Sequence, residues 1–387
     1  MANNTVFEEV SLEKLNRFHI MSHHLLTKAG KNQLERVIND ICGLHSQLAM
    51  TPTLSLWNRM RNFRKNLLEE ALYIKKSLVR VWCMRGTLHI ILSDELPIYH
   101  QAVKRMWFEH HGRYMRGPDW PPLDIRKNVI YPKILEALKE GPLTRTELNT
   151  KVSAVLEPDF QRYERLFSAW GGILKEMCYL GLVVYAEPNR KTRFARLDHW
   201  LPHMSLEQMT EKEARTKLLI KYLHGYGPAS VQDFAYWSGI TISESRKVFT
   251  ETKQTLKEIK VKGVKNPLWL LKVDLNRVEG MNVNEKPLVH LLPRFDPLLL
   301  GHKDKSRILK SEHLKQVFRP AGDVAATVLA GGHIKGTWNY KKTKNKLIVK
   351  LSPFEKLEKD ELEKIHTEAE ALSDLMEVSQ VKLLVNS

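Results

Sequence analysis

The sequence predicts a mainly helical protein with a β-rich C-terminal part, an α+β fold, on three observations. A Gly-Pro-x-Thr/Ser turn that leads into an amphipathic helix occurs twice, at Gly141 and again 86 positions later at Gly227. Each copy is followed by a further helical segment and by a basic, β-prone hairpin. Past residue 281, short β-prone runs alternate with glycine-rich turns. Self-similarity at this spacing indicates repeated supersecondary units.

The order helix, turn, helix, helix and hairpin is that of the winged helix, a nucleic-acid-binding unit. We therefore predict three tandem winged helices and a fourth domain. The fourth is expected to be a small β-barrel or sheet, closed by a charged helix from about Glu355 to Met376. The predicted domains are residues 1–118, 119–200, 201–280 and 281–387.

The clearest copy is 201–280. Ser230 followed by Asp233, and Thr241 followed by Glu244, have the spacing of capping boxes and predict two helix starts. The helix that begins at Thr241 is the expected recognition helix. Its candidate DNA-binding residues are Arg246 and Lys247.

The copy at 119–200 follows the same plan. Thr144 and Glu147 predict a capped helix, Tyr163 to Leu180 the third helix, and Leu182 to Phe194 the hairpin. Basic side chains gather at the tip and return strand of that hairpin. Such clustering favours phosphate contact over plain solubility. The residues are Arg190, Lys191, Arg193 and Arg196.

The first copy is the weakest. An apolar stripe from Leu34 to Ile41 predicts a helix, and the run from Val79 to Leu92 predicts a hairpin of strands. The hairpin carries two further candidate DNA-binding residues, Arg85 and His89. Two interpretations of Arg85 stay open: it contacts phosphate, or it braces the turn at Gly86.

The charge of the chain is large and unevenly placed. The formal net charge is +17, yet Glu355 to Glu377 contains nine acidic and three basic side chains. That tail therefore carries about −6 and the remainder about +23. A concentrated basic surface favours a polyanionic partner through counterion release, so double-stranded DNA is the expected partner.

Other classes of protein are disfavoured. Cys42, Cys83 and Cys178 are far apart and form no CxxC pair, which favours a reducing compartment over disulfides or zinc. The first ten residues do not resemble a signal peptide, and no run approaches 18 apolar residues. We expect a cytoplasmic, nucleoid-associated monomer with no cofactor and no metal.

The segment from Ile41 to Gln47 is the most suggestive for chemistry. A helix running straight through would place His45 on the apolar stripe, as a core histidine. Gly43, however, is a plausible helix stop. An extended segment after it would put His45 and Gln47 on the same side, because strand side chains alternate.

Four blocks resemble those of the AlkZ/YcaQ-like winged-helix DNA glycosylases, over nearly the whole chain. The resemblance implies tandem winged helices and a C-terminal β-barrel around a C-shaped basic channel. It also implies monofunctional removal of alkylated bases, including bulky N7-guanine adducts and some interstrand crosslinks. The blocks are Gly43–Gln47 (GLHSQ), Arg80–His89 (RVWCMRGTLH), Pro293–Arg307 (PRFDPLLLGHKDKSR) and Gly331–Trp338 (GGHIKGTW).

The catalytic motif of that family is Gln-x-Gln or Gln-x-Asp, and it corresponds to His45-Ser46-Gln47 here. His45 replaces the first glutamine, and Ser46 replaces an apolar residue. The resemblance implies that His45 and Gln47 are catalytic. Neutral histidine is a competent substitute, because it accepts a hydrogen bond from water and acts as a general base.

A charged cluster in the third block has two interpretations, DNA contact or an internal salt-bridge network. Its candidate DNA-binding residues are His302, Lys303 and Arg307, beside Asp296.

Two other functional classes also stay open. A sequence-specific regulator would need only the recognition helices, and a catalytically inactive lesion sensor would bind damaged DNA without releasing a base.

We predict that base release slows as the pH falls below about 6, near the ordinary pKa of histidine. Protonated His45 cannot accept a proton from water and repels a cationic alkylated base. Initial rates of base release measured across pH test this. A constant rate between about pH 5 and 8 would exclude His45 as the base.

Overall fold

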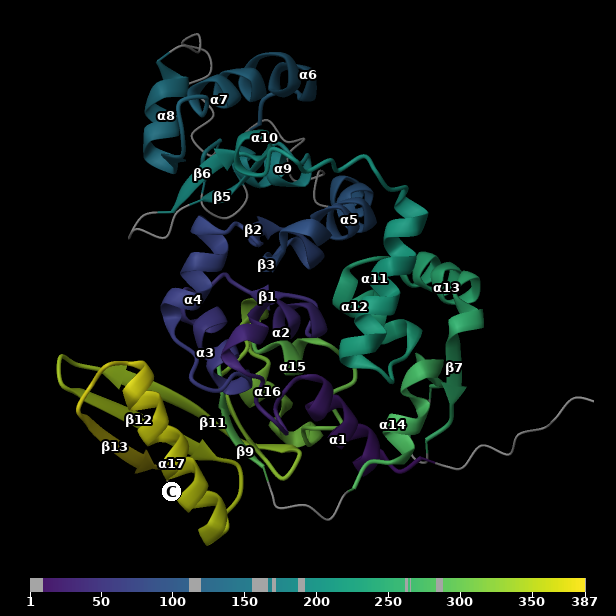
Figure 1. The fold of residues 1–387 in the computed structure, drawn as a ribbon, viewed down its shortest axis with the longest axis vertical. Helices are drawn as coiled ribbons and strands as arrows, with labels where there is room; N and C mark the ends of the chain where they lie inside the picture. Colours follow the sequence, from purple (N-terminus) through teal and green to yellow (C-terminus); the bar gives the residue numbers. More distant parts are fainter. Residues whose placement is uncertain are drawn as a thin grey trace, which may run out of the picture. The chain divides into compact units, whose positions relative to one another are not determined.

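The computed structural model shows a mixed α/β protein whose chain divides into two compact units (Figure 1). The first unit comprises 1–65, 219–237 and 241–387, and the second comprises 66–218 and 238–240. The predicted division into four domains stays a prediction. The structure describes residues 10–110, 120–154, 166–168, 172–186, 192–261, 264, 266–282 and 288–386.

Apolar periodicity sets the helices of the first unit, and turn residues end them. The predicted stop after the stripe at Leu34 is confirmed: the helix ends at Asp40, and Cys42 (φ 56°) and Gly43 (φ 94°) turn the chain. Helices entirely or mostly in this unit are α1 (Leu12–Ser22), α2 (Leu34–Asp40), α3 (Met50–Arg59), α12 (Val231–Ser238), α13 (Ile242–Glu251), α14 (Leu275–Glu279), α15 (Pro297–Leu300), α16 (Leu314–Val317) and α17 (Lys359–Leu375).

The element order predicted for 201–280 is confirmed: α11 (Glu211–Tyr226), α12, α13, then the paired strands β7 (Leu256–Ile259) and β8 (Leu268–Leu271). Both predicted helix starts are present. The amide of Asp233 donates to Ser230 Oγ at 3.1 Å, and the amide of Glu244 donates to Thr241 Oγ1 at 3.3 Å. An aromatic cluster packs these elements together, formed by Tyr222, Phe234, Trp237, Phe249 and Trp269.

The C-terminal strands form a sheet, with order β13-β12-β11-β10-β9. Neighbouring strands are antiparallel, except that β12 and β13 are parallel because α17 carries the chain back between them. The predicted helix from about Glu355 to Met376 is confirmed as α17. The strands are β9 (Val289–Leu292), β10 (Thr327–Ala330), β11 (His333–Lys342), β12 (Lys346–Pro353) and β13 (Gln380–Val385).

Of the two expected forms, a small β-barrel or a sheet, the sheet is confirmed and the β-barrel is wrong. In the described part of the chain β9 and β13 are the two edges of an open sheet. The physical reason is α17, which contacts β9, β12 and β13 and lies across the sheet in Figure 1. Its apolar stripe of Ile365, Ala369 and Leu372 is buried. A helix that covers the apolar face of a sheet removes the need for the sheet to close on itself.

The strands of the second unit run in the order β3-β2-β5-β6-β4. The hairpin predicted for Val79 to Leu92 is confirmed as β2 and β3, with Val81 opposite His89. The strands are β2 (Leu78–Trp82), β3 (Leu88–Leu92), β4 (Leu143–Thr144), β5 (Val183–Ala186) and β6 (Arg193–Arg196). The helices are α4 (Lys65–Glu69), α5 (Leu96–His110), α6 (Leu123–Ile125), α7 (Tyr131–Ala137), α8 (Arg145–Ser153), α9 (Ile173–Tyr179) and α10 (Leu197–Trp200).

One capping prediction in this unit is confirmed and one helix prediction is wrong. Thr144 and Glu147 form a reciprocal capping box at the start of α8. The helix expected from Tyr163 begins only at Ile173. Leu166 and Phe167 lie in a turn, while 155–165 and 169–171 fall outside the described residues. That turn packs against Gly172, where a Cβ atom would meet the Leu166 carbonyl oxygen at 2.7 Å, so the helix starts after the turn.

None of the helices in the described part of the chain is long and apolar enough to cross a membrane.

Candidate active site

The candidate catalytic segment follows the left-handed turn at Cys42 and Gly43 and begins with β1 (Leu44–His45). This confirms an extended chain at His45 and excludes the alternative of one continuous helix. The His45 side chain is only 3% exposed, whereas Gln47 is partly exposed. In this segment Gln47 is therefore accessible in part, whereas His45 is buried.

The end of α2 and the turn after it are fixed by α11. The Tyr226 hydroxyl donates to the Ile41 carbonyl oxygen at 3.0 Å, and the Cys42 thiol donates to the Lys221 carbonyl oxygen at 3.2 Å. Gly225 allows close approach, because a Cβ atom there would meet the Asp40 carbonyl oxygen at 2.2 Å. The backbone leading to His45 thus has contacts on several sides.

The Asp40 carboxylate adds a charged anchor at the same point. His24 Nε2 lies 2.8 Å from one carboxylate oxygen, and His224 Nε2 lies 3.4 Å from the other. Burial by itself would raise the pKa of Asp40, but hydrogen bonds from His224 and His24 outweigh it and hold the pKa well below its usual range. Asp40 therefore stays ionised and keeps both imidazoles oriented toward the end of α2.

The His45 imidazole stacks on Phe295. The ring centroids are 4.7 Å apart and the ring planes differ by 14°. Phe295 has a left-handed backbone (φ 58°), and the Arg294 guanidinium lies 5.6 Å from its ring centroid. Thr51 of α3 donates to the Arg294 carbonyl oxygen at 2.9 Å. A parallel stack restricts the orientation of the imidazole plane.

The Phe295 loop is held by a fully buried ion pair between Arg59 and Asp296. The two guanidinium nitrogens of Arg59 lie 2.9 and 2.7 Å from the Asp296 carboxylate oxygens, and neither side chain is exposed. Asp296 also accepts the Leu298 amide at 3.0 Å, at the start of α15. Since Arg59 ends α3, the pair joins the helix that follows Gln47 to the loop that carries Phe295.

Phe295 and Arg59 were not identified as site residues from the sequence. Phe295 lies within Pro293–Arg307, one of the four blocks that resemble the glycosylase family, and that resemblance could have identified it. Arg59 carried no such signal, because its partner Asp296 is 237 positions away.

His302 and Arg307 are buried and bonded within the protein. His302 Nε2 donates to the Tyr226 carbonyl oxygen at 2.9 Å, and an Arg307 guanidinium nitrogen donates to the Pro228 carbonyl oxygen at 2.8 Å. Burial and the nearby charges of Arg307 and Lys305 lower the pKa of His302 well below its usual range. These contacts favour the internal network over DNA contact for both residues. The Lys303 side chain is exposed.

The remaining basic candidates differ in exposure. Arg246 and Lys247 are exposed on α13. Arg193 is half-buried and donates to the Pro142 carbonyl oxygen and the Glu147 carboxylate, at 2.9 and 3.1 Å. Arg190 and Lys191 lie outside the described residues.

Two candidates belong to the β2–β3 hairpin. His89 is buried, and its Nδ1 lies 3.1 Å from the Thr87 carbonyl oxygen. Arg85 is partly exposed at the turn between the strands and has a left-handed backbone (φ 54°). Of the pair, Arg85 is therefore the better placed to meet a ligand.

One group in the described residues has the spacing of cation ligands: Glu312, His313 and Glu355, whose ligand atoms lie within 4.8 Å of one another. Lys310 forms an ion pair with Glu355, so one of the two carboxylates of this group already has a counter-charge from the protein. His313 also stacks on Phe354.

Comparisons with known proteins agree with this architecture. The family model described as "DNA glycosylase AlkZ-like" matches residues 38–375. An "Interstrand DNA cross-link repair glycosylase" of Streptomyces sahachiroi is 27% identical over 369 residues, covering 90% of this chain and 92% of that protein. The solved structure of Streptomyces sahachiroi DNA glycosylase AlkZ has a TM-score of 0.81 at 22% identity, covering 98% of this chain and all of that one. The structural match shows a shared fold.

We predict that Asp296→Asn lowers the free energy of unfolding by about 3–5 kcal/mol, because it leaves the Arg59 guanidinium buried without its counter-charge. Urea unfolding measures this loss. The matched control is Asp323→Asn, which breaks the Arg294–Asp323 ion pair, a pair more exposed than Arg59–Asp296. This control should lower the free energy of unfolding by less than about 1 kcal/mol. Equal losses in the two variants would show that the buried ion pair contributes no more to stability than the exposed one.

Proposed function

The chain belongs to the AlkZ-like DNA glycosylase family, and we propose that it hydrolyses the N-glycosidic bond of N7-alkylguanine in duplex DNA. The product would be an abasic site, and excision would be monofunctional. The observation that carries the proposal is the position of the His45 imidazole, which stacks on Phe295. His45 precedes the partly exposed Gln47 by two residues. The Streptomyces relative, an interstrand DNA cross-link repair glycosylase by name, supports extending the substrate range to bulky or cross-linked adducts.

The proposed substrate needs little help to leave. Alkylation at N7 places a positive charge on guanine, so the departing base requires no strong general acid. The remaining requirements are stabilisation of the positive charge that develops on the sugar and a water placed at its anomeric carbon. Both can be met by neutral polar side chains that are held rigidly.

His45 and Gln47 divide this work in the proposed mechanism. Neutral His45 accepts a proton from the attacking water, a role typically worth about 10²–10⁴-fold in rate. The Gln47 amide oxygen accepts the second hydrogen bond of the same water and fixes its direction. The Phe295 stack and the Arg59–Asp296 pair keep the imidazole in place, so the water meets a preorganised base.

DNA binding is assigned to exposed cations of the third predicted winged helix and of the C-terminal part of the chain. Arg246 and Lys247 on α13, with Lys303 beside α15, are exposed and able to meet phosphates. The net charge of +17 supports a basic channel, occupied by one duplex on a monomer. Phosphate contacts of this kind hold undamaged DNA with little sequence preference, as a search for lesions requires.

We predict base release from an oligonucleotide that contains one N7-methylguanine, at pH 7.5. Alkaline cleavage reveals abasic sites, and spontaneous depurination without enzyme is subtracted. His45→Ala should slow release by about 10²–10⁴-fold, and Gln47→Ala should also slow it, with DNA binding within a few-fold of wild type. The control His366→Ala, at an exposed histidine of α17, should keep the full rate.

His45→Gln makes the test sharper, because it restores the Gln-x-Gln form of the family motif. That variant should release base without the loss of rate below about pH 6 that is expected of histidine. Tight, salt-sensitive binding without any release in the wild type would contradict the proposal. The protein would then be a non-catalytic lesion sensor.

A further inference from the structure

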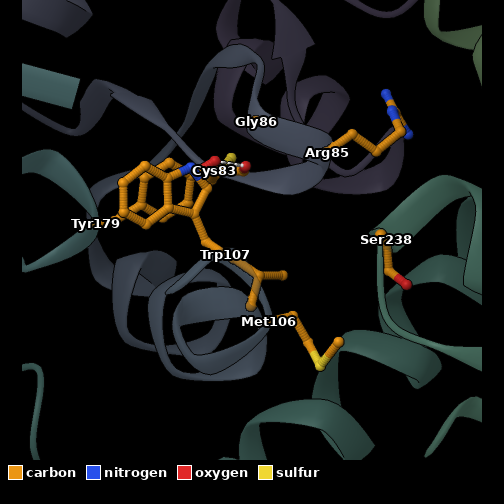
Figure 2. A pocket seen from close by; sticks show the side chains of 9 residues that line it. Cys83, Arg85, Gly86, Met106, Trp107, Tyr179 and Ser238 are labelled. Carbon is orange, nitrogen blue, oxygen red and sulfur yellow. Dashed lines mark hydrogen bonds between the residues drawn. The ribbon is translucent and has the colours of Figure 1, made fainter. Parts of the chain in front are cut away.

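A pocket of about 170 Å³ lies entirely within the second unit. Its walls come from the β2–β3 turn, from α5, from Tyr179 at the end of α9, and from the end of α12 (Figure 2). The lining residues are Cys83, Arg85, Gly86, Val103, Met106, Trp107, Tyr179, Ser238 and Gly239. An apolar protein cavity of about 150 Å³ is known to hold benzene. The pocket therefore has room for a planar ring.

The turn at the mouth of the pocket is built around Arg85. Arg85 and Gly86 are both left-handed, with φ of 54° and 70°. Lys175 Nζ donates to the Gly86 carbonyl oxygen at 2.9 Å, and a Cβ atom at Gly239 would lie 3.3 Å from the Arg85 amide nitrogen. A left-handed arginine costs about 1–3 kcal/mol that glycine would avoid. This cost points to a role for the Arg85 side chain.

Two aromatic side chains line the pocket, and Arg85 is the one charged residue among those that line it. Trp107 stacks on Tyr179, with ring centroids 4.4 Å apart and planes 15° apart. Burial raises the pKa of the Cys83 thiol to about 12 and that of Tyr179 well above its usual range, so both stay protonated. Among the lining residues none is acidic, and Arg85 supplies the charge. Figure 2 shows its side chain extending away from the aromatic pair, on the side where Ser238 lies.

An aromatic pocket with a cation at its mouth fits a planar ring attached to an anion, which describes a nucleotide. We propose that this pocket binds one extrahelical nucleotide of DNA, with the base inside the pocket and the adjacent phosphate on Arg85. The proposal rests on the proposed function only in taking DNA as the partner. It places no chemical step in the pocket, whose thiol and phenol are protonated.

The test uses the full chain and a duplex without alkylated bases that carries one bulged 2-aminopurine. Acrylamide quenches the fluorescence of an exposed 2-aminopurine, so a base inside the pocket should be shielded several-fold. Arg85→Gly suits the left-handed backbone and should fold normally. It should weaken binding of the bulged duplex by about ten-fold, the loss expected for one charge-assisted hydrogen bond, and bring quenching close to that of free DNA.

Two further variants complete the test. Val103→Phe narrows the pocket without changing charge, and it should abolish shielding while binding of the fully paired duplex persists. Lys151→Ala removes an exposed cation of α8 in the same unit and should leave shielding unchanged. If Val103→Phe fails to fold, the quenching and binding measured with Arg85→Gly decide whether the proposal holds.

Equal quenching with and without wild-type protein, or full shielding by Arg85→Gly, would overturn the proposal. His45→Ala separates this question from the proposed function, because that variant should shield 2-aminopurine as the wild type does. Shielding without base release would refute only the proposed reaction, and base release without shielding would refute only the pocket.

Discussion

The candidate active site depends on one buried ion pair, Arg59 with Asp296. Both side chains are fully buried, and their paired contacts join the end of α3 to the loop before α15. Phe295, next to Asp296, stacks on His45, and α3 directly follows the segment that contains Gln47. An arginine fork holds a carboxylate in a fixed direction, so this pair sets the orientation of the surface on which His45 rests.

Hydrogen bonds between buried polar groups connect the helices and loops of the first unit. Asp233 accepts the Ser230 hydroxyl at 2.6 Å and the Lys303 amide at 2.8 Å, which ties α12 to the loop beyond α15. In that loop His302 and Arg307 bond backbone carbonyl oxygens of Tyr226 and Pro228. A buried polar group without a partner is costly, so such networks specify a single arrangement of the chain. A basic composition thus serves two purposes: some cations hold the fold, and exposed ones remain for a polyanion.

Left-handed turns recur where side chains of interest are presented. Cys42 and Gly43 precede His45, Phe295 supports it, and Arg85 stands at the mouth of the pocket in the second unit. Strained backbone persists only where surrounding contacts fix it, and here α11 and Lys175 supply them. A left-handed residue changes the direction of the chain abruptly, so the side chains beside it face differently from those of the preceding element.

The sequence by itself determined the features that depend on neighbours a few positions apart. Ser230 with Asp233 and Thr144 with Glu147 start their helices, and Gly43 ends one, because these hydrogen bonds and dihedral angles are local. Only the tertiary structure decided the rest. It placed Phe295 under His45, buried Arg307, and left the C-terminal sheet open beneath α17. These outcomes depend on contacts across hundreds of positions, such as the 237 between Arg59 and Asp296, and no local pattern encodes which distant groups will meet.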